Sequence, residues 1–297
     1  MKTTYNWVDK NEYPFESKYI DSTHGKMHYI DEGKGEVILF VHGNPNWSFG
    51  YRELIKNFSK NYRCIALDHI GFGLSDKPYD VSYLPQFHAA NLEWFIEELG
   101  LKDITIVMHD WGGPISINYI ERHRENVKAV IAFNSWFWSI KGVKTLEMFS
   151  GFLGSAFGRM LCKYFNFFPK VLLKGDVGDK SRFPKAIHEQ YVKPFPSPKT
   201  RKGTWTFPAS FLKQDHWLAG LWEKRSALDQ LPALLLWGLK DKGFPEPFLV
   251  NWKSAFPENK VVKFDFSGHN SPEEIGKDAI PYVAQFLKEQ EKMAVLN

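Results

Sequence analysis

The residue best placed to do chemistry is Asp110, an acidic side chain at a sharp turn. The apolar, β-branched residues 104–107 predict a buried strand before it. Gly112-Gly113 follow, and residues 114–120 are typical of a helix with proline in its first turn. Such a strand-to-helix turn presents its tip residue as a nucleophile. A serine esterase would carry Ser there, so the sequence indicates attack by a carboxylate, although an Asp before Gly-Gly can also simply cap the helix.

Two further residues, Asp241 and His269, could support such a nucleophile. His269 follows one predicted strand and precedes a helix, and Asp241 follows the strand before it. A catalytic His needs an acid partner that fixes its tautomer, and Asp241 is the carboxylate best placed to provide one. The structural alternatives are a turn residue for Asp241 and a purely structural His269. The chain order Asp110, Asp241, His269 fits nucleophile, acid and base.

Asn44 and Trp111 are candidates for stabilising a leaving group. The Asn44 amide and the Trp111 indole are neutral N–H donors, which suit a departing anion in an apolar cavity. Their backbone N–H groups also fit an oxyanion hole. The alternatives are an ordinary Asn-Pro turn at Asn44 and simple packing for Trp111.

The elements that must position these residues alternate between strands and helices. Apolar runs predict strands over residues 18–20, 26–30, 36–41, 63–67, 104–107, 127–133, 233–237 and 261–264. Helical patterns occupy residues 51–57, 83–99, 114–120 and 272–288. This alternation predicts an α/β fold with a mostly parallel sheet, in which loops at the strands' carboxyl ends meet in one crevice.

Between residues 139 and 225 the strand signals disappear. Phe, Pro and Gly are frequent there, and helices are expected at residues 152–161, 184–191 and 208–219. Irregular loops of that length are rare in compact domains. We therefore expect residues 1–138 and 226–297 to form the core, and residues 139–225 to form an inserted helical cap.

The composition limits the classes of function. The 297 residues carry a net charge of +4 without a basic stripe, which disfavours a nucleic-acid partner. Cys64 and Cys162 suggest neither a disulfide framework nor a metal site. The first residues lack an apolar signal segment, and no apolar run is long enough to span a membrane. These features predict a cytoplasmic protein with no membrane partner, and its aromatic content of 16% suits an apolar ligand cavity.

Three motifs together resemble the haloalkane dehalogenases of the α/β-hydrolase superfamily. They are His42-Gly43-Asn44-Pro45, residues 68–78 (DHIGFGLSDKP) and His109-Asp110-Trp111-Gly112-Gly113. The resemblance covers nearly the whole core and is weakest across the cap.

This resemblance implies Asp110 as nucleophile, His269 as base, Asp241 as supporting acid, and Asn44 with Trp111 as the halide-binding pair. The expected reaction forms an alkyl ester on Asp110, which water activated by His269 then hydrolyses. It takes a small apolar halogenated substrate, releases a halide ion, and needs no metal or organic cofactor. Met108 and Asn270 depart from the usual family residues, which leaves the substrate preference open. The oligomeric state is also open.

Three other functions are possible for a chain with these motifs. Epoxide hydrolases share the elbow motif but protonate the epoxide oxygen with cap tyrosines, for which Tyr164 and Tyr191 are available; that family usually has an aromatic residue in place of Asn44. Fluoroacetate dehalogenases usually have Arg where this chain has Trp111. A non-catalytic module with this fold would typically lack a member of the triad, and this chain retains every candidate.

Overall fold

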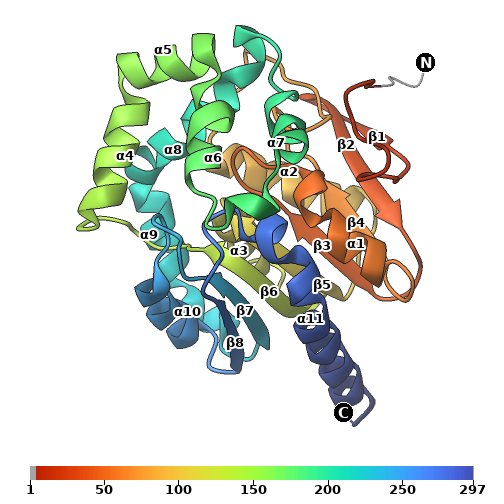
Figure 1. The fold of residues 1–297 in the computed structure, drawn as a ribbon. Coiled ribbons are helices and arrows are strands. Elements are labelled where there is room, and N and C mark those ends of the chain that lie inside the picture. Colours follow the sequence, from red (N-terminus) through yellow and green to blue (C-terminus); the bar gives the residue numbers. More distant parts are fainter. Residues whose placement is uncertain (1–4, 297) are drawn as a thin grey trace.

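A computed structural model describes residues 5–296, with side chains up to residue 293. Its centre is an eight-stranded sheet in the order β1-β2-β4-β3-β5-β6-β7-β8 (Figure 1). β2 runs antiparallel to both of its neighbours, and all other pairs are parallel. The strands are β1 Lys18–Ser22, β2 Gly25–Glu32, β3 Val37–Val41, β4 Arg63–Leu67, β5 Ile104–Asp110, β6 Val127–Ser135, β7 Ala233–Gly238 and β8 Asn259–Phe264. The predicted α/β fold with a mostly parallel sheet is confirmed.

Helices cover both faces of this sheet because side chains of a strand alternate between its faces. In β3, Leu39 and Val41 belong to one buried cluster, and Ile38 and Phe40 belong to the other. The first cluster includes residues of α2 (Pro85–Glu98), α3 (Gly112–Ile120) and α10 (Leu249–Ala255). The second includes residues of α1 (Arg52–Phe58) and α11 (Ser271–Leu296). Burial on both faces explains why the central strands are apolar throughout.

The chain between β6 and β7 is helical and lies over the carboxyl ends of the strands (Figure 1). Its helices are α4 Lys144–Gly154, α5 Ala156–Phe165, α6 Leu173–Gly175, α7 Lys185–Val192, α8 Lys202–Lys213 and α9 Asp215–Glu223, with a π-helical turn at Phe168–Leu172. We call this set the cap helices. Within residues 5–296, no helix has both the length and the apolar character needed to cross a membrane.

The single helix predicted at residues 152–161 is wrong. Ser155 lies between α4 and α5 with an extended backbone, and its Oγ accepts a hydrogen bond from the Gly158 N–H at 3.1 Å. A Ser in this conformation is a favourable N-cap, so it ends one helix and starts the next. The helical sequence pattern continues across Ser155, although one helix ends there and a second helix begins.

The helix predicted at residues 208–219 is also wrong, because it joins parts of two helices. α8 begins at Lys202 and contains Pro208, and α9 begins only after Gln214. A proline inside a helix has no N–H for the carbonyl four residues earlier. That carbonyl belongs to Thr204, and it accepts a hydrogen bond from the Asn44 side chain at 3.4 Å instead. Tertiary contact therefore compensates for the missing helical bond.

Candidate active site

The turn at Asp110 is held in a conformation that only close packing can maintain. Asp110 ends β5 with a φ of 50°, a region that L-residues rarely adopt. The Ser135 hydroxyl donates to the Asp110 carbonyl oxygen at 2.7 Å. A side chain at Gly112 would lie 2.1 Å from the Val41 carbonyl oxygen, and one at Gly113 would lie 1.9 Å from Ser135 Oγ. Two glycines in sequence thus allow α3 to start directly behind the turn, at Gly112.

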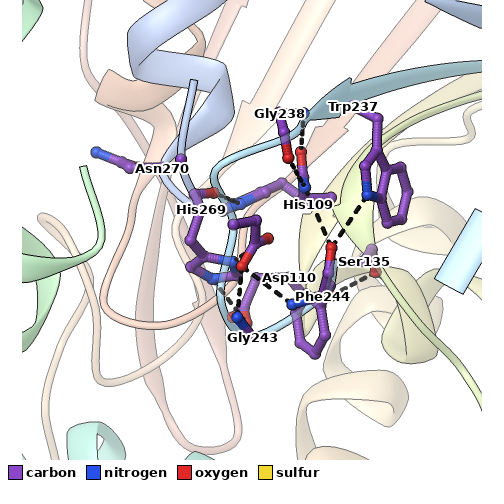
Figure 2. A network of polar contacts seen from close by, with 12 residues as sticks. His109, Asp110, Ser135, Trp237, Gly238, Gly243, Phe244, His269 and Asn270 are labelled. Carbon is purple, nitrogen blue, oxygen red and sulfur yellow. Dashed lines mark hydrogen bonds and ion pairs between the residues drawn. The ribbon is translucent and has the colours of Figure 1, made fainter. Parts of the chain in front are cut away.

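The two carboxylate oxygens of Asp110 have different surroundings. The Asn44 backbone N–H donates to Oδ1 at 2.7 Å. His269 Nε2 lies 3.4 Å from Oδ2, on the other side of the carboxylate. Figure 2 shows Asp110 and His269 facing each other. Asp110 is the last residue of β5, and His269 lies in the loop between β8 and α11. One oxygen is therefore held by backbone and the other faces an imidazole.

Asp241 lies behind His269, as the sequence predicts for a supporting acid. His269 Nδ1 and Asp241 Oδ2 are 2.9 Å apart, while Oδ1 of Asp241 accepts the backbone N–H groups of Gly243 (2.7 Å) and Phe244 (3.0 Å). Burial lowers the pKa of His269, but the charge of Asp241 and the hydrogen bonds to Asp110 and Asp241 hold it well above 6.5. Burial likewise raises the pKa of Asp241, and the charge of His269 with these hydrogen bonds brings it below 3.8. The pair therefore favours an ionised acid and a firmly oriented imidazole.

A buried hydrogen-bond network, which the sequence did not predict, fixes the backbone of His269. His109 Nε2 lies 2.7 Å from the His269 carbonyl oxygen (Figure 2). Asn46 Nδ2 lies 3.3 Å from His109 Nδ1 and 3.1 Å from Asn270 Oδ1. Burial and the charge of His269 lower the pKa of His109 to about 4. A neutral His109 can then donate from Nε2 to the His269 carbonyl oxygen and accept at Nδ1 from the Asn46 amide.

Asn44 and Trp111 both border one cavity of about 260 Å³, together with Asp110 and His269. The Trp111 ring is held by aromatic neighbours, with ring centres of Trp136 at 4.7 Å, Phe211 at 5.0 Å and Phe207 at 5.2 Å. The remaining lining is mostly apolar and comes mainly from the cap helices and the loop after β7: Thr145, Leu146, Phe149, Phe168, Leu173, Asp176, Pro208, Phe211, Lys242, Gly243 and Phe244. The structure thus brings all five predicted site residues together.

Asp176 and Lys242 are two charged residues of the cavity lining that the sequence analysis did not identify. Asp176 follows α6, and its backbone oxygen accepts the His269 N–H at 2.9 Å. Burial raises the pKa of its carboxyl above 3.8. No motif marks either position, because both depend on how the cap helices and the loop after β7 meet.

Several other candidates lie away from the cavity. Tyr164 is 58% exposed, and the buried Tyr191 donates to Glu273 at 2.5 Å, so neither supplies a proton to this cavity. Met108 is buried in the core, and Asn270 contacts Asn46; neither belongs to the lining.

One group of possible metal ligands occurs elsewhere among the described residues. Ligand atoms of Glu93, Glu97 and His123 lie within 4.8 Å of one another. Glu93 is already paired with His123 at 2.7 Å and with Arg122 at 2.8 Å. Cys64 and Cys162 are both free and buried.

Comparison with known proteins places this architecture in context. Residues 36–274 match the family described as the alpha/beta hydrolase fold. Haloalkane dehalogenase 2 of Mycobacterium tuberculosis (strain ATCC 25618 / H37Rv) is 35% identical over 263 residues, which cover 88% of this chain and 91% of the relative. The cis-3-alkyl-4-alkyloxetan-2-one decarboxylase of Shewanella oneidensis is 34% identical over 291 residues, covering 95% of this chain and 91% of the relative.

A solved structure agrees in fold. The haloalkane dehalogenase DbeA from Bradyrhizobium elkani superposes with a TM-score of 0.84 at 22% identity, covering 94% of this chain and 99% of that one. The family match, the relatives and the shared fold lead to one conclusion: the chain belongs to the haloalkane dehalogenase family of the α/β-hydrolase superfamily.

Proposed function

We propose that this protein hydrolyses haloalkanes to an alcohol and a halide ion through a covalent ester on Asp110. The observation that carries the proposal is the position of Asp110, which borders an apolar cavity with its Oδ2 facing His269 and its Oδ1 held by backbone. The haloalkane dehalogenase relative at 35% identity supports the same reaction class. Residues 139–225 act as the cap that closes the cavity over a small apolar substrate.

In the first step, Oδ2 of Asp110 attacks the carbon that bears the halogen, and the halide leaves with the bonding electron pair. A carboxylate can do this directly because the carbon is sp³ and the leaving group needs no proton. The Asn44 amide and the Trp111 indole N–H groups receive the halide. Both are neutral donors in an otherwise apolar wall, so they stabilise the anion as it forms.

In the second step, His269 takes a proton from a water molecule, and the resulting hydroxide attacks the carboxyl carbon of Asp110. Oδ1 then carries the negative charge, next to the Asn44 N–H that contacts it at 2.7 Å, with the Trp111 N–H as second donor. Esterification also removes the Asp110 charge that helps to raise the pKa of His269. The imidazole therefore becomes easier to deprotonate at the stage where it must act as base. The oxyanion then collapses, the bond between the carboxyl carbon and the ester oxygen breaks, and the alkoxide takes the proton from the His269 imidazolium and leaves as the alcohol. Asp110 is left as a carboxylate.

The test is bromide release from 1-bromobutane, measured beside diol formation from styrene oxide with the same enzyme. The proposal predicts bromide release without diol. Diol formation alone would replace it with epoxide hydrolysis. Asp110→Asn should abolish turnover, because an amide is a poor nucleophile towards an alkyl halide.

A second candidate is decarboxylation of a cis-3-alkyl-4-alkyloxetan-2-one, because the relative with that name aligns over 95% of this chain. Loss of CO₂ from such a ring leaves an alkene, so the reaction consumes no water. Asp176 and Lys242 favour this candidate, since an ester ring offers oxygen atoms that an acid or an ammonium group can contact.

Offering the enzyme a cis-3,4-dialkyl oxetanone and measuring alkene by gas chromatography separates the two candidates. Alkene formation together with negligible bromide release from 1-bromobutane would favour the decarboxylase. Bromide release without alkene would favour the dehalogenase.

A further inference from the structure

The outer surface of helices α4 and α5 carries a concentration of exposed apolar side chains. Six of the thirteen large hydrophobic side chains that are exposed among the described residues lie on these two helices, each with 36% to 75% of its surface accessible. They are Met148, Phe152, Phe157, Met160, Tyr164 and Phe165, and together they form what we call the α4–α5 face. Singly exposed apolar residues are ordinary, whereas a contiguous set marks an interaction surface.

The spacing of these residues shows that the face is a feature of the helices. Phe157, Met160 and Tyr164 follow at intervals of three and four on α5, while Gly158 and Cys162 on its other side are buried. On α4, Met148 and Phe152 are likewise four residues apart. Both helices therefore pack inward with one stripe of side chains and present a second, apolar stripe outward. The two helices lie at the outer edge of the cap (Figure 1).

Positive charge accompanies these apolar residues on the same two helices. Lys144 on α4 and Arg159 on α5 are exposed, and neither forms an ion pair with a carboxylate within the described part of the chain. Residues 139–225 contain sixteen Lys and Arg but six Asp and Glu, a net charge of +10. Since the whole chain carries +4, the rest of the protein carries −6. Positive charge is thus concentrated in residues 139–225, and the rest of the protein is negatively charged.

We propose that the α4–α5 face docks the enzyme on an anionic lipid bilayer. Apolar and aromatic side chains next to lysine and arginine are the combination by which a helix lies in a membrane interface. A second copy of this chain is a poor occupant for the same face, because pairing it with itself would bring like charges together. The expectation of no membrane partner rested on the absence of a spanning segment, which interfacial binding does not require.

The position of α4 connects such docking to the cavity. Leu146 and Phe149 line the cavity from the inward side of α4, while Met148 and Phe152 lie on its outward side. One helix therefore separates the proposed membrane contact from the space where the substrate would bind. An apolar substrate dissolved in the bilayer would have a short path to that cavity.

The test is co-sedimentation of the full-length protein with vesicles of phosphatidylcholine containing about 30 mol% phosphatidylglycerol, compared with pure phosphatidylcholine. Binding should require the anionic lipid and weaken as salt is raised. Phe157→Ser combined with Phe165→Ser should reduce binding at least about tenfold. Arg159→Gln combined with Lys144→Gln should reduce it by about 25-fold, given about fivefold for each lost charge.

The matched control replaces two exposed apolar residues outside the face, Val250→Ser with Tyr282→Ser, and should bind as the parent does. Equal binding by the face variants and this control would overturn the proposal, as would no binding to either vesicle. Self-association of the parent that the Phe157 and Phe165 variant loses, without vesicle binding, would assign the face to a second copy instead. All variants alter exposed residues, so circular dichroism should report an unchanged fold.

Discussion

At the scale of single residues, the site depends on an asymmetry between the two oxygens of Asp110. Oδ1 is fixed by the Asn44 backbone N–H at 2.7 Å, and Oδ2 faces His269 across 3.4 Å. An oxygen already bound to an N–H is the weaker nucleophile and the better site for a developing oxyanion. Asn44 consequently has two separable roles, one for its backbone and one for its side chain.

Replacing Asn44 by Ala should separate these two roles. The backbone N–H remains, so hydrolysis of the ester should keep its rate, whereas loss of the amide should slow halide departure by about 10²–10³-fold. Rapid-quench measurement of ester formation and of its decay gives the two rates independently. Equal slowing of both steps would show that the side chain does not act on the halide alone.

The pH dependence should likewise differ between the two steps. As base, His269 must be neutral, and protonation as the pH falls through its pKa in the ester form should slow the second step. The first step does not use the imidazole as base and should keep its rate over the same pH interval. Single-turnover rates measured between about pH 5 and 9 would show this; a parallel decline of both steps would contradict the assignment.

At the scale of elements, helix α8 contributes to the site through a defect. Pro208 leaves the Thr204 carbonyl without its helical partner, and the Asn44 amide lies 3.4 Å from that oxygen. The proline thereby links a cap helix to the loop that follows β3. Asn44 Oδ1 has no hydrogen-bond partner within residues 5–296, so this single contact orients the amide.

Pro208→Ala tests this link. The introduced alanine would offer an N–H to the Thr204 carbonyl, compete with Asn44, and free the amide to rotate, so bromide affinity should fall several-fold while thermal stability holds or rises. Pro281→Ala is a matched control, because Pro281 also lies inside a helix, α11, and does not line the cavity. Bromide titration and thermal unfolding of both variants decide the question; equal bromide affinities would remove the role given to Pro208.

How well the sequence predicts an element depends on whether local pattern alone determines it. The strand predicted at residues 63–67 is confirmed to the residue, because four of its five side chains are buried and its ends are marked by polar residues. Helix α10 was not predicted, and the breaks at Ser155 and Gln214 depend on packing that no local period encodes. For the site, strand ends and motifs were enough to predict Asp110 and His269. The hydrogen-bond network around His109 and the position of Asp176 could be recognised only in the folded structure.

At the scale of the whole molecule, buried neutral histidines make stability depend on pH. His69, His88 and His109 are fully or almost fully buried, and burial lowers the pKa of each, to about 3 for His88 and about 4 for His109. The unfolded chain, with histidine pKa values near 6.5, therefore takes up more protons than the folded one as the pH falls below that value. Stability should decrease from about pH 6.5 towards pH 4.

His88→Phe should reduce this sensitivity. His88 stacks on Phe207 with ring centres 4.7 Å apart, so an aromatic ring of similar size can replace it. Each unit between folded and unfolded pKa values is worth about 1.4 kcal/mol, so removing this titration should recover roughly a few kcal/mol at pH 4. Urea unfolding at pH 7 and pH 4 gives the difference. If the free energy of unfolding falls between pH 7 and pH 4 by the same amount in the variant as in the parent, His88 does not contribute to the pH dependence.

The proposed reaction depends on a covalent ester on Asp110. Intact-protein mass spectrometry of the His269→Phe variant tests for this ester most directly. Without the imidazole base, the first step should proceed and the second should stop. Incubation with 1-bromobutane should then add one butyl group in place of a proton, located on the peptide that contains Asp110. Asp110→Asn should show no such adduct. A folded His269→Phe variant that gains no mass, or carries the butyl group on another residue, would contradict the mechanism.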